Sequence, residues 1–325
     1  MDQLCVGHKI LMLRKAVTIN VLGCRLFGTV HEPSGQHKAG AHTKLAAGIL
    51  LVSFGHQPRS WVGDLGAHCA DQLCSAGYHV FRFDMPGLGD SPGELPVHLE
   101  VLWNFILEGG HATYAAALAK EILRQYRLEQ LVLGGFCGGS STALFACDPM
   151  EKEIQGLILL EPEMGLVTLP KNTLPQKAYE VENVASFLER KELLWLRLRS
   201  PASWKKLLSG KSDLNYWARL IPYMLDRIRD NLEGRILPPE TNVPFLNRWK
   251  DCSRKRLPML MLTVGHPTRR KYYASYGLKP GQSNRNTGLT WIEIEGTTHA
   301  MVSGGAKESV PAHLVKWMET NFPLG

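Results

Sequence analysis

A thiol lies at the centre of a glycine-rich segment, Gly135-Phe136-Cys137-Gly138-Gly139. The segment follows an expected strand at 130–135 and opens an expected helix at 138–146, so it forms a strand-to-helix turn. A nucleophile on so sharp a turn needs small residues two positions before and after it, because strand and helix approach closely there. Gly135 and Gly139 occupy those positions, and we predict that Cys137 is a nucleophile. A buried structural cysteine and a phosphate-binding turn are the alternatives that the segment leaves open.

A histidine follows the last expected strand of the chain. His299 comes after a strand at 289–294 and the segment Glu295-Gly296-Thr297-Thr298. A neighbouring imidazole can lower the pKa of a thiol and exchange protons with a reacting group. The chain holds 12 histidines, and the position of this one after the final strand predicts that it acts together with Cys137.

The elements that must position these residues alternate between strand and helix. Such alternation predicts an α/β protein with a parallel sheet covered on both faces. It stops between 166 and 255, where the sequence is helical in character and rich in Trp and Arg, so this part is expected to be an insertion. Strands are expected over 16–31 (as a strand or hairpin), 46–54, 79–83, 130–135, 155–160, 258–264 and 289–294, and helices over 61–76, 112–126, 138–146 and 309–322.

Elements and motifs together resemble the α/β-hydrolase superfamily, and most closely its monoglyceride-lipase-like and serine-aminopeptidase-like branch. The resemblance rests on Ser53-Phe54-Gly55-His56, on the loop Asp84-Met85-Pro86-Gly87-Leu88-Gly89-Asp90-Ser91, on the strand-to-helix turn at Cys137, called a nucleophile elbow in this family, and on His299. It implies an α/β-hydrolase fold with a mostly parallel central sheet, flanking helices and an inserted helical lid. The expected core is 1–164 and 257–325, with the lid at 165–256. The usual serine nucleophile is a cysteine here, as in dienelactone hydrolases of the same superfamily.

The acid of the resembled family is not in its usual place. The loop after the strand at 258–264 normally supplies an Asp, but here it reads Gly265-His266-Pro267-Thr268-Arg269-Arg270-Lys271. Its basic residues His266, Arg269 and Arg270 are expected to be exposed, and a place beside the site that binds an anionic group is the alternative. Some family members take the acid from the end of the preceding strand, which implies Glu161 as the orienting acid and Glu163 as second choice. A Cys–His dyad without an acid and a pair of solvated carboxylates remain open.

The oxyanion hole of the family is made of two backbone N–H groups. The resemblance implies Gly138, which follows the nucleophile, as one donor. The loop after the strand at 46–54 supplies the other, and there the family's His-Gly pair is replaced by Phe54-Gly55. His56, the next residue, is therefore the expected second donor, and a plain loop histidine is the alternative.

Composition limits the other classes of protein. With 44% hydrophobic and 21% charged residues in 325, the chain is expected to be globular, with no stretch near the roughly 20 apolar residues of a membrane span. The first 15 residues lack the apolar run and cleavage site of a signal peptide. Seven cysteines without a CxxC pair indicate neither a zinc site nor a disulfide framework and favour a cytoplasmic location.

Basic residues are concentrated in one part of the chain. The net charge is +7, and residues 186–275 hold 19 Lys and Arg against 8 Asp and Glu. A solvated helical surface, a groove for an anionic substrate such as a phosphopantetheine-linked acyl group, and a face that meets anionic lipid are open interpretations. No zinc-finger, RNA-recognition or helix-turn-helix signature accompanies the charge, so nucleic acid is not an expected partner.

These expectations combine into one leading function. The chain is predicted to be a hydrolase that cleaves an ester, thioester or lactone through an acyl-cysteine, with Cys137, His299 and Glu161 as the triad. An acyltransferase that uses the same intermediate and a non-catalytic ligand-binding protein on a hydrolase fold are the alternatives. The expected partner is a small-molecule acyl substrate, with an anionic or carrier-linked group as one option. The chemistry needs no metal or organic cofactor, and the oligomeric state stays open.

Overall fold

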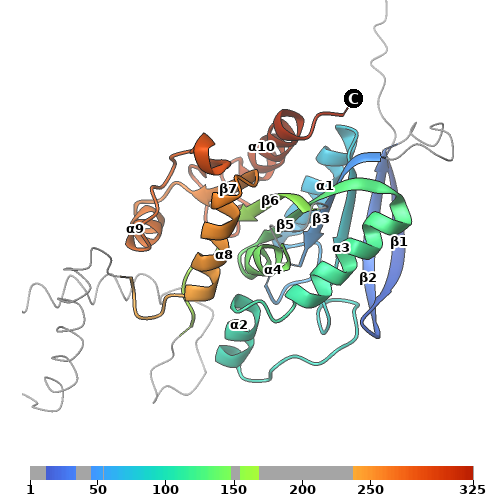
Figure 1. Ribbon diagram of the computed structural model, residues 1–325, viewed down its shortest axis with the longest axis horizontal. Helices are drawn as coiled ribbons and strands as arrows, with labels where there is room; N and C mark the ends of the chain where they lie inside the picture. Colours follow the sequence, from blue (N-terminus) through green and yellow to red (C-terminus); the bar gives the residue numbers. More distant parts are fainter. Residues whose placement is uncertain (1–11, 34–44, 54, 148–153, 168–236, 325) are drawn as a thin grey trace, which may run out of the picture. The chain divides into compact units, whose positions relative to one another are not determined.

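The structure is a computed structural model that describes residues 12–33, 45–53, 55–147, 154–167 and 237–324 (Figure 1). Contacts divide the chain into two units. The first holds the described residues up to 167, together with Glu240–Arg269 and the residues from Lys279 onward. The described residues of the second are 237–239 and Arg270–Leu278. The sheet, its covering helices and the candidate site all belong to the first unit.

One sheet organises the first unit. Among the described residues, eight strands pair in the order β1-β2-β4-β3-β5-β6-β7-β8, and the neighbours from β4 to β8 along this order are parallel. Only β1 with β2 and β2 with β4 are antiparallel within it. The mostly parallel α/β sheet expected from the sequence is confirmed. The strands are β1 (Met12–Val21), β2 (Cys24–Pro33), β3 (Leu45–Val52), β4 (His79–Phe83), β5 (Leu128–Phe136), β6 (Ile154–Leu160), β7 (Met259–Val264) and β8 (Leu289–Ile294).

The composition of the strands explains their places in the sheet. The inner strands β6 and β7 are mostly apolar, IQGLILL and MLMLTV, as expected for parallel strands whose two faces are covered by helices. The hairpin of β1 and β2 turns at Leu22 and Gly23, which both have positive φ, at 50° and 77°. A two-residue turn with positive φ at both positions matches the twist of the flanking strands, so it sets the register of this hairpin.

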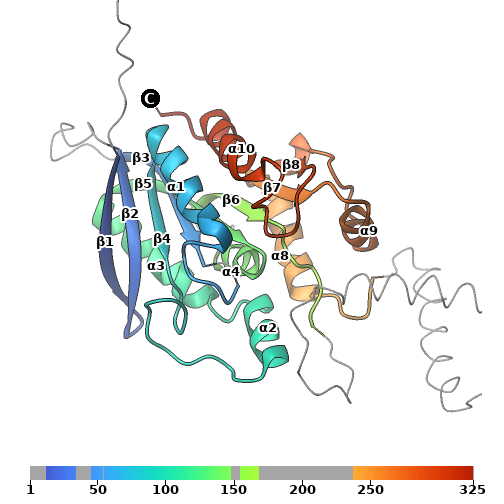
Figure 2. The same cartoon turned by 180° about the vertical axis from the view of Figure 1, so that it is seen from behind.

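Helices lie on both faces of the sheet. Helices α1 and α10 pack together on one face, and α3, α4 and α8 follow one another on the opposite face, as Figures 1 and 2 show from the two sides. Leu65, Cys69 and Leu73 of α1 are fully buried at a spacing of four residues, which gives this helix one apolar face toward the core. The helices are α1 (Leu65–Ser75), α2 (Leu99–Leu107), α3 (Ala112–Tyr126), α4 (Gly138–Ala146), α8 (Val243–Arg254), α9 (Pro267–Ser275) and α10 (Ala306–Asn321).

Two helices differ from the sequence expectations. The segment after β7 was expected to be a loop, but α9 begins at Pro267, and proline is favoured at the first helical position because its N–H would be unpaired there in any case. Helix α8 lies inside the expected lid at 165–256, yet it packs on α4 and groups with the core. Asn242 caps α8 by accepting from Phe245 N–H and ties it to α2 by donating to the Leu107 carbonyl, 2.7 Å away.

The rest of the expected lid, residues 168–236, lies outside the described residues, so the lid stays a prediction. Among the helices that are described, none has the length and apolar character that crossing a bilayer requires.

Candidate active site

The carboxyl ends of the parallel strands bring the predicted site residues to one edge of the sheet. Cys137 follows β5 and Glu161 follows β6, and the strand-end residues Phe136 and Leu160 are register partners. His299 lies in the loop between β8 and α10. Because parallel strands end at the same edge, residues 137, 161 and 299 meet there although they are far apart in the sequence.

Cys137 occupies a strained turn between β5 and α4. Its φ of 53° and ψ of −119° lie in a region that side-chain-bearing residues rarely adopt, and it is the N-cap residue of α4. A Cβ on Gly135 would lie 2.1 Å from the carbonyl oxygen of Gly139, and a Cβ on Gly139 would lie 2.2 Å from that of Ser53. Glycine is therefore required at both positions predicted from the sequence, and the turn has the geometry of a nucleophile elbow.

The elbow is held by hydrogen bonds across its base. Cys137 N–H donates to the Leu160 carbonyl at 2.8 Å. The hydroxyl of Ser140 contacts the carbonyl oxygens of Gly135 and Leu160, at 2.8 and 2.9 Å. Ser140 therefore ties the end of β5 to the end of β6, and these bonds fix the direction in which the Cys137 side chain leaves the sheet.

Glu161 is a fully buried carboxylate directly after β6. One of its oxygens, Oε1, accepts from Val264 N–H at 2.5 Å, and the other, Oε2, is 2.9 Å from Nδ1 of His299. Burial disfavours its charged form, but the positive charge of Arg269, together with the contacts from His299 and Val264, lowers the pKa of Glu161. The carboxylate therefore stays ionised and accepts a hydrogen bond from Nδ1–H of the imidazole.

Arg269 occupies the region where the resembled family places its acid. The sequence favours an exposed arginine here, with a place in the site as the alternative, and the side chain is in fact largely buried and forms ion pairs with two carboxylates. Its Nε is 2.8 Å from Glu161 Oε2, and its Nη1 is 3.1 Å from Glu163 Oε1. The prediction of exposure was wrong because the buried carboxylate of Glu161 and the partly exposed one of Glu163 need a cation to balance their charge.

Cys137, His299 and Glu163 converge on one point. The thiol sulfur, a ring nitrogen of His299 and a carboxylate oxygen of Glu163 all lie within 4.8 Å of one another. Cys137 is 4% exposed, and the His299 side chain is 25% exposed. Since Nδ1 of His299 faces Glu161, its other nitrogen, Nε2, is left for the sulfur. The structure thus brings together Cys137, His299, Glu161 and Glu163.

The charges around His299 favour its protonated form. Burial alone would lower the pKa of His299, but the negative charge of Cys137 and the hydrogen bond to it, then the bond to Glu161 and the charge of Glu163, raise it to about 10. The ring of Phe136 packs edge-on against the imidazole, with the ring centroids 5.7 Å apart. The negative charges around His299 therefore favour the imidazolium, and Phe136 packs against the ring.

Two backbone segments approach each other beside the thiol. A Cβ on Gly138 would lie 3.1 Å from the Cα of Gly55, so the turn after β3 passes close to the first residue of α4. The N–H of a residue at the start of a helix has no partner within that helix, which leaves Gly138 N–H available. Next to Gly55, the imidazole of His56 packs edge-on against Trp103, with ring centroids 5.1 Å apart, and burial lowers the pKa of His56. Gly138 therefore lies close to the turn that carries His56, and the role of these two residues as oxyanion donors stays a prediction.

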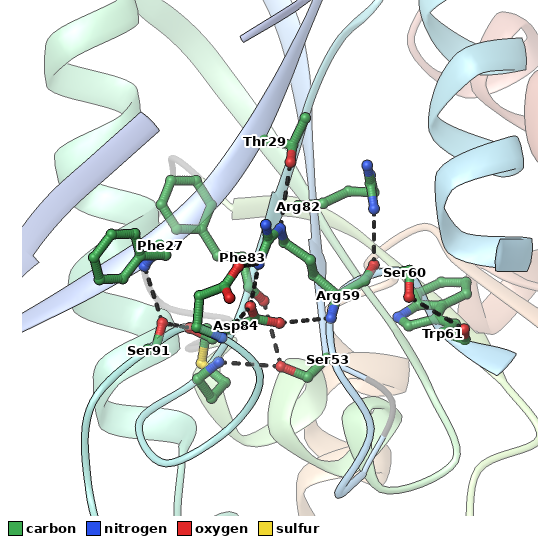
Figure 3. Close-up of polar contacts among 12 residues, drawn as sticks. Phe27, Thr29, Ser53, Arg59, Ser60, Trp61, Arg82, Phe83, Asp84 and Ser91 are labelled. Atoms are coloured by element: carbon green, nitrogen blue, oxygen red, sulfur yellow. Dashed lines mark hydrogen bonds and ion pairs between the residues drawn. The ribbon is translucent and has the colours of Figure 1, made fainter. Parts of the chain in front are cut away.

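The turn after β3 is fixed by a buried carboxylate from the loop after β4. Asp84 is fully buried and accepts from Arg59 N–H at 2.6 Å, and its second oxygen pairs with the Arg59 guanidinium (Figure 3). The hydroxyl of Ser53, at the end of β3, accepts from Met85 N–H at 3.1 Å. In the sequence, the Asp84–Ser91 motif indicates only a resemblance to the family. Its structural role is to lock the turn that carries Gly55 and His56.

Comparisons with known proteins agree with this architecture. A model of the alpha/beta hydrolase fold matches residues 49–231, more than half of the chain. An esterase from Pyrococcus furiosus has a TM-score of 0.53 at 12% identity, covering 96% of this chain and 92% of that chain. The alpha/beta hydrolase GrgF from Penicillium has a TM-score of 0.52 at 15% identity, covering 95% and 99%.

A dienelactone hydrolase from Anabaena variabilis has a TM-score of 0.50 at 12% identity, covering 96% of this chain and 99% of that chain. At such low identities these structures show the shared fold alone. No curated protein sequence is significantly similar to the chain. The match to the family model extends over β3–β6 and the Cys137 elbow, and with the strand order and the edge-aligned site residues it shows that the chain belongs to the α/β-hydrolase fold family.

Proposed function

We propose that the chain is a hydrolase that cleaves an ester, thioester or lactone of a small acyl substrate through an acyl-cysteine at Cys137. The observation that carries the proposal is the convergence of a thiol, an imidazole and a buried carboxylate at the edge where the parallel strands end. A protein that only binds a ligand has no need of this convergence. Family membership supports a hydrolase, and the residues present decide which chemistry it performs.

The thiolate of Cys137 is the nucleophile in this proposal. It lies at the N-terminus of α4, and the imidazolium of His299 lies beside it, so two sources of positive charge stabilise the thiolate. The sulfur attacks the carbonyl carbon, and the backbone N–H groups of Gly138 and His56 stabilise the resulting oxyanion. The carbonyl re-forms as the bond to the leaving group breaks, and the leaving group takes the proton from His299.

Water then releases the acyl group. Neutral His299 removes a proton from the attacking water, the tetrahedral intermediate collapses, and Cys137 leaves as a thiolate beside the re-formed imidazolium. Glu161 accepts a hydrogen bond from Nδ1–H throughout and keeps Nε2 directed at the reacting atoms. A thioester intermediate suits esters, thioesters and lactones better than amides, because an amine is a poorer leaving group than an alkoxide or a thiolate.

Intact-mass labelling with a panel of activated esters and thioesters tests the proposal. The native chain should gain the mass of one acyl group, which is then lost as product is released. Neither Cys137→Ala nor His299→Ala should show this gain and loss of mass. Cys24→Ser is the matched control, because Cys24 is a partly exposed thiol far from the elbow in the sequence. Absence of an adduct at Cys137 with every donor would refute the proposal. An adduct that clears only when an alcohol or amine is added would replace hydrolysis by acyl transfer.

A further inference from the structure

The residues that meet beside the elbow also form a set of metal ligands. We propose that Cys137, His299 and Glu163 form a binding site for Zn²⁺, which blocks the thiol when it is occupied. No metal-ligand spacing in the sequence points to this site, because its members are separated by 26 and 136 residues. The fold brings them together from the ends of β5, β6 and β8.

The distances between the ligand atoms are close to those that zinc requires. Zn–S and Zn–N or Zn–O bonds of about 2.3 and about 2.0–2.2 Å in a tetrahedron place the ligand atoms about 3.3–3.6 Å apart. The three atoms here all lie within 4.8 Å of one another, so closing the site needs shifts of about 1 Å. Side-chain rotations supply movements of this size, and His299 and Glu163 are both partly exposed. The fourth position of the tetrahedron stays open to water.

The residues behind the ligands orient them as metal sites require. Ligating histidines usually donate their second ring N–H to a carboxylate, and His299 Nδ1 lies 2.9 Å from Glu161 Oε2. Ligating carboxylates are themselves held by donors, and Arg269 Nη1 lies 3.1 Å from Glu163 Oε1. Both outer contacts are in place without a metal, so the ligands need little reorganisation to bind one.

The chemistry of the ligands selects the metal. One thiolate and one carboxylate neutralise a divalent cation, and the sulfur and imidazole ligands favour Zn²⁺ over Mg²⁺ or Ca²⁺, which prefer oxygen. Metal binding must displace the proton held by His299, which costs affinity but leaves this order of preference unchanged. The sulfur that binds zinc is the one that the proposed reaction uses, so an occupied site has no free nucleophile.

Binding and inhibition depend on different assumptions. The zinc site depends only on the positions of the three ligands, whereas inhibition of turnover rests on the proposed function. An experiment that measures binding without substrate therefore separates the two: a chain that binds zinc but forms no acyl-cysteine refutes the function and leaves the site.

The test is a titration of the full chain with Co²⁺ and then Zn²⁺. Tetrahedral Co²⁺ bound to a thiolate gives a sulfur-to-metal charge-transfer absorption, which Zn²⁺ should abolish by displacement, while Mg²⁺ should leave it unchanged. Cys137→Ser should lose this absorption, and Glu163→Gln should weaken Zn²⁺ binding at least tenfold, since even outer contacts of a metal site contribute about 10–100-fold to affinity. Glu129→Gln is the matched control, because Glu129 is an exposed carboxylate near the start of β5.

Any of three results would overturn the proposal. The native chain could lack the charge-transfer absorption, or Cys137→Ser could show the same absorption as the native chain. The third is that Glu163→Gln and Glu129→Gln bind Zn²⁺ with equal affinity. Circular dichroism and thermal unfolding of each variant show whether it is folded. If Glu163→Gln is unfolded, Glu163→Asp takes its place. The Glu163→Asp variant has a shorter carboxylate side chain, so it should bind Zn²⁺ more weakly than the Glu129→Gln control.

Discussion

Replacing Glu161 by Gln changes one atom of the side chain that holds His299 and leaves the size of that side chain unchanged. Both carboxylate oxygens face N–H donors: Oε1 accepts from Val264 N–H, and Oε2 faces Nδ1 of His299 and Nε of Arg269. A glutamine has only one oxygen. Its amide nitrogen must therefore face N–H groups on one side or the other, and such a clash between donors is costly at a buried side chain.

The cost of this clash sets the size of the effect. A buried hydrogen bond to a charged group contributes about 1.5–3 kcal/mol, so its loss at His299 should slow the reaction of Cys137 by about 10- to 150-fold, at 1.4 kcal/mol for each factor of ten. The imidazolium loses the carboxylate that stabilises it, and the thiolate consequently loses its partner. Glu163→Gln keeps the contact between Glu161 and His299, so we expect it to slow the reaction by less than about tenfold.

The rate of alkylation of Cys137 by iodoacetamide measures this effect without a known substrate. The second-order rate constant is obtained from intact mass against time at neutral pH, and peptide mapping assigns the adduct to Cys137. Equal rates in the native chain and Glu161→Gln would refute the role of Glu161. A larger loss in Glu163→Gln than in Glu161→Gln would make Glu163 the orienting acid.

Three further predictions concern stability, measured as the free energy of unfolding in urea. Asp84→Asn should lower the free energy of unfolding by about 3–5 kcal/mol, because it leaves Arg59 without its buried partner. Asp90→Asn removes a 65% exposed partner of the same arginine and should lower it by less than about 1 kcal/mol. Equal losses in the two variants would contradict the anchoring role of Asp84. Gly139→Ala should cost at least about 1–3 kcal/mol, because its Cβ would lie 2.2 Å from a backbone oxygen, and an unchanged urea midpoint would show that the elbow is not tight. Burial and the neighbouring positive charge of Arg82 lower the pKa of His31 from 6.5 to about 4. As pH falls, His31 is therefore protonated in the unfolded chain before it is protonated in the folded chain. The free energy of unfolding should fall by up to roughly 3 kcal/mol between about pH 6.5 and about pH 4. In His31→Gln this part of the pH dependence should disappear, and a native-like slope in the variant would assign the loss to other groups.

The local signals of the sequence predicted the fold well. The helices at 112–126 and 138–146 and the strands at 79–83 and 289–294 have the bounds expected from periodicity and glycine positions. Cys137 could be singled out because the elbow's steric demand falls on Gly135 and Gly139, which lie beside it in the sequence. Such features depend on neighbouring residues and are therefore visible in one chain.

Features that depend on contacts between distant residues were harder to predict. Glu161 could be proposed from its place at a strand end, but the direction of its side chain depends on Val264 and His299, which are far along the chain. The pairing of Arg269 with both carboxylates was missed for the same reason. A usable signal was present: a loop that carries arginine where an acid is usual indicates a carboxylate elsewhere on the same edge.

The neighbouring ends of β6 and β7 bear on how this kind of site can change during evolution. The last residue of β7, Val264, donates to the same carboxylate after β6 that faces His299, so the two strand ends lie beside one imidazole. In a family whose acid usually follows β7, a lineage can therefore gain an acid after β6 before it loses the one after β7. Each intermediate in that order keeps an orienting group for the histidine. Once the acid after β7 is redundant, a basic residue such as Arg269 can take its place, and the carboxylates after β6 then retain that basic residue by charge. A search for active members of the family should therefore ask for a carboxylate at this edge, and a chain without an acid after β7 should not be classed as inactive on that ground.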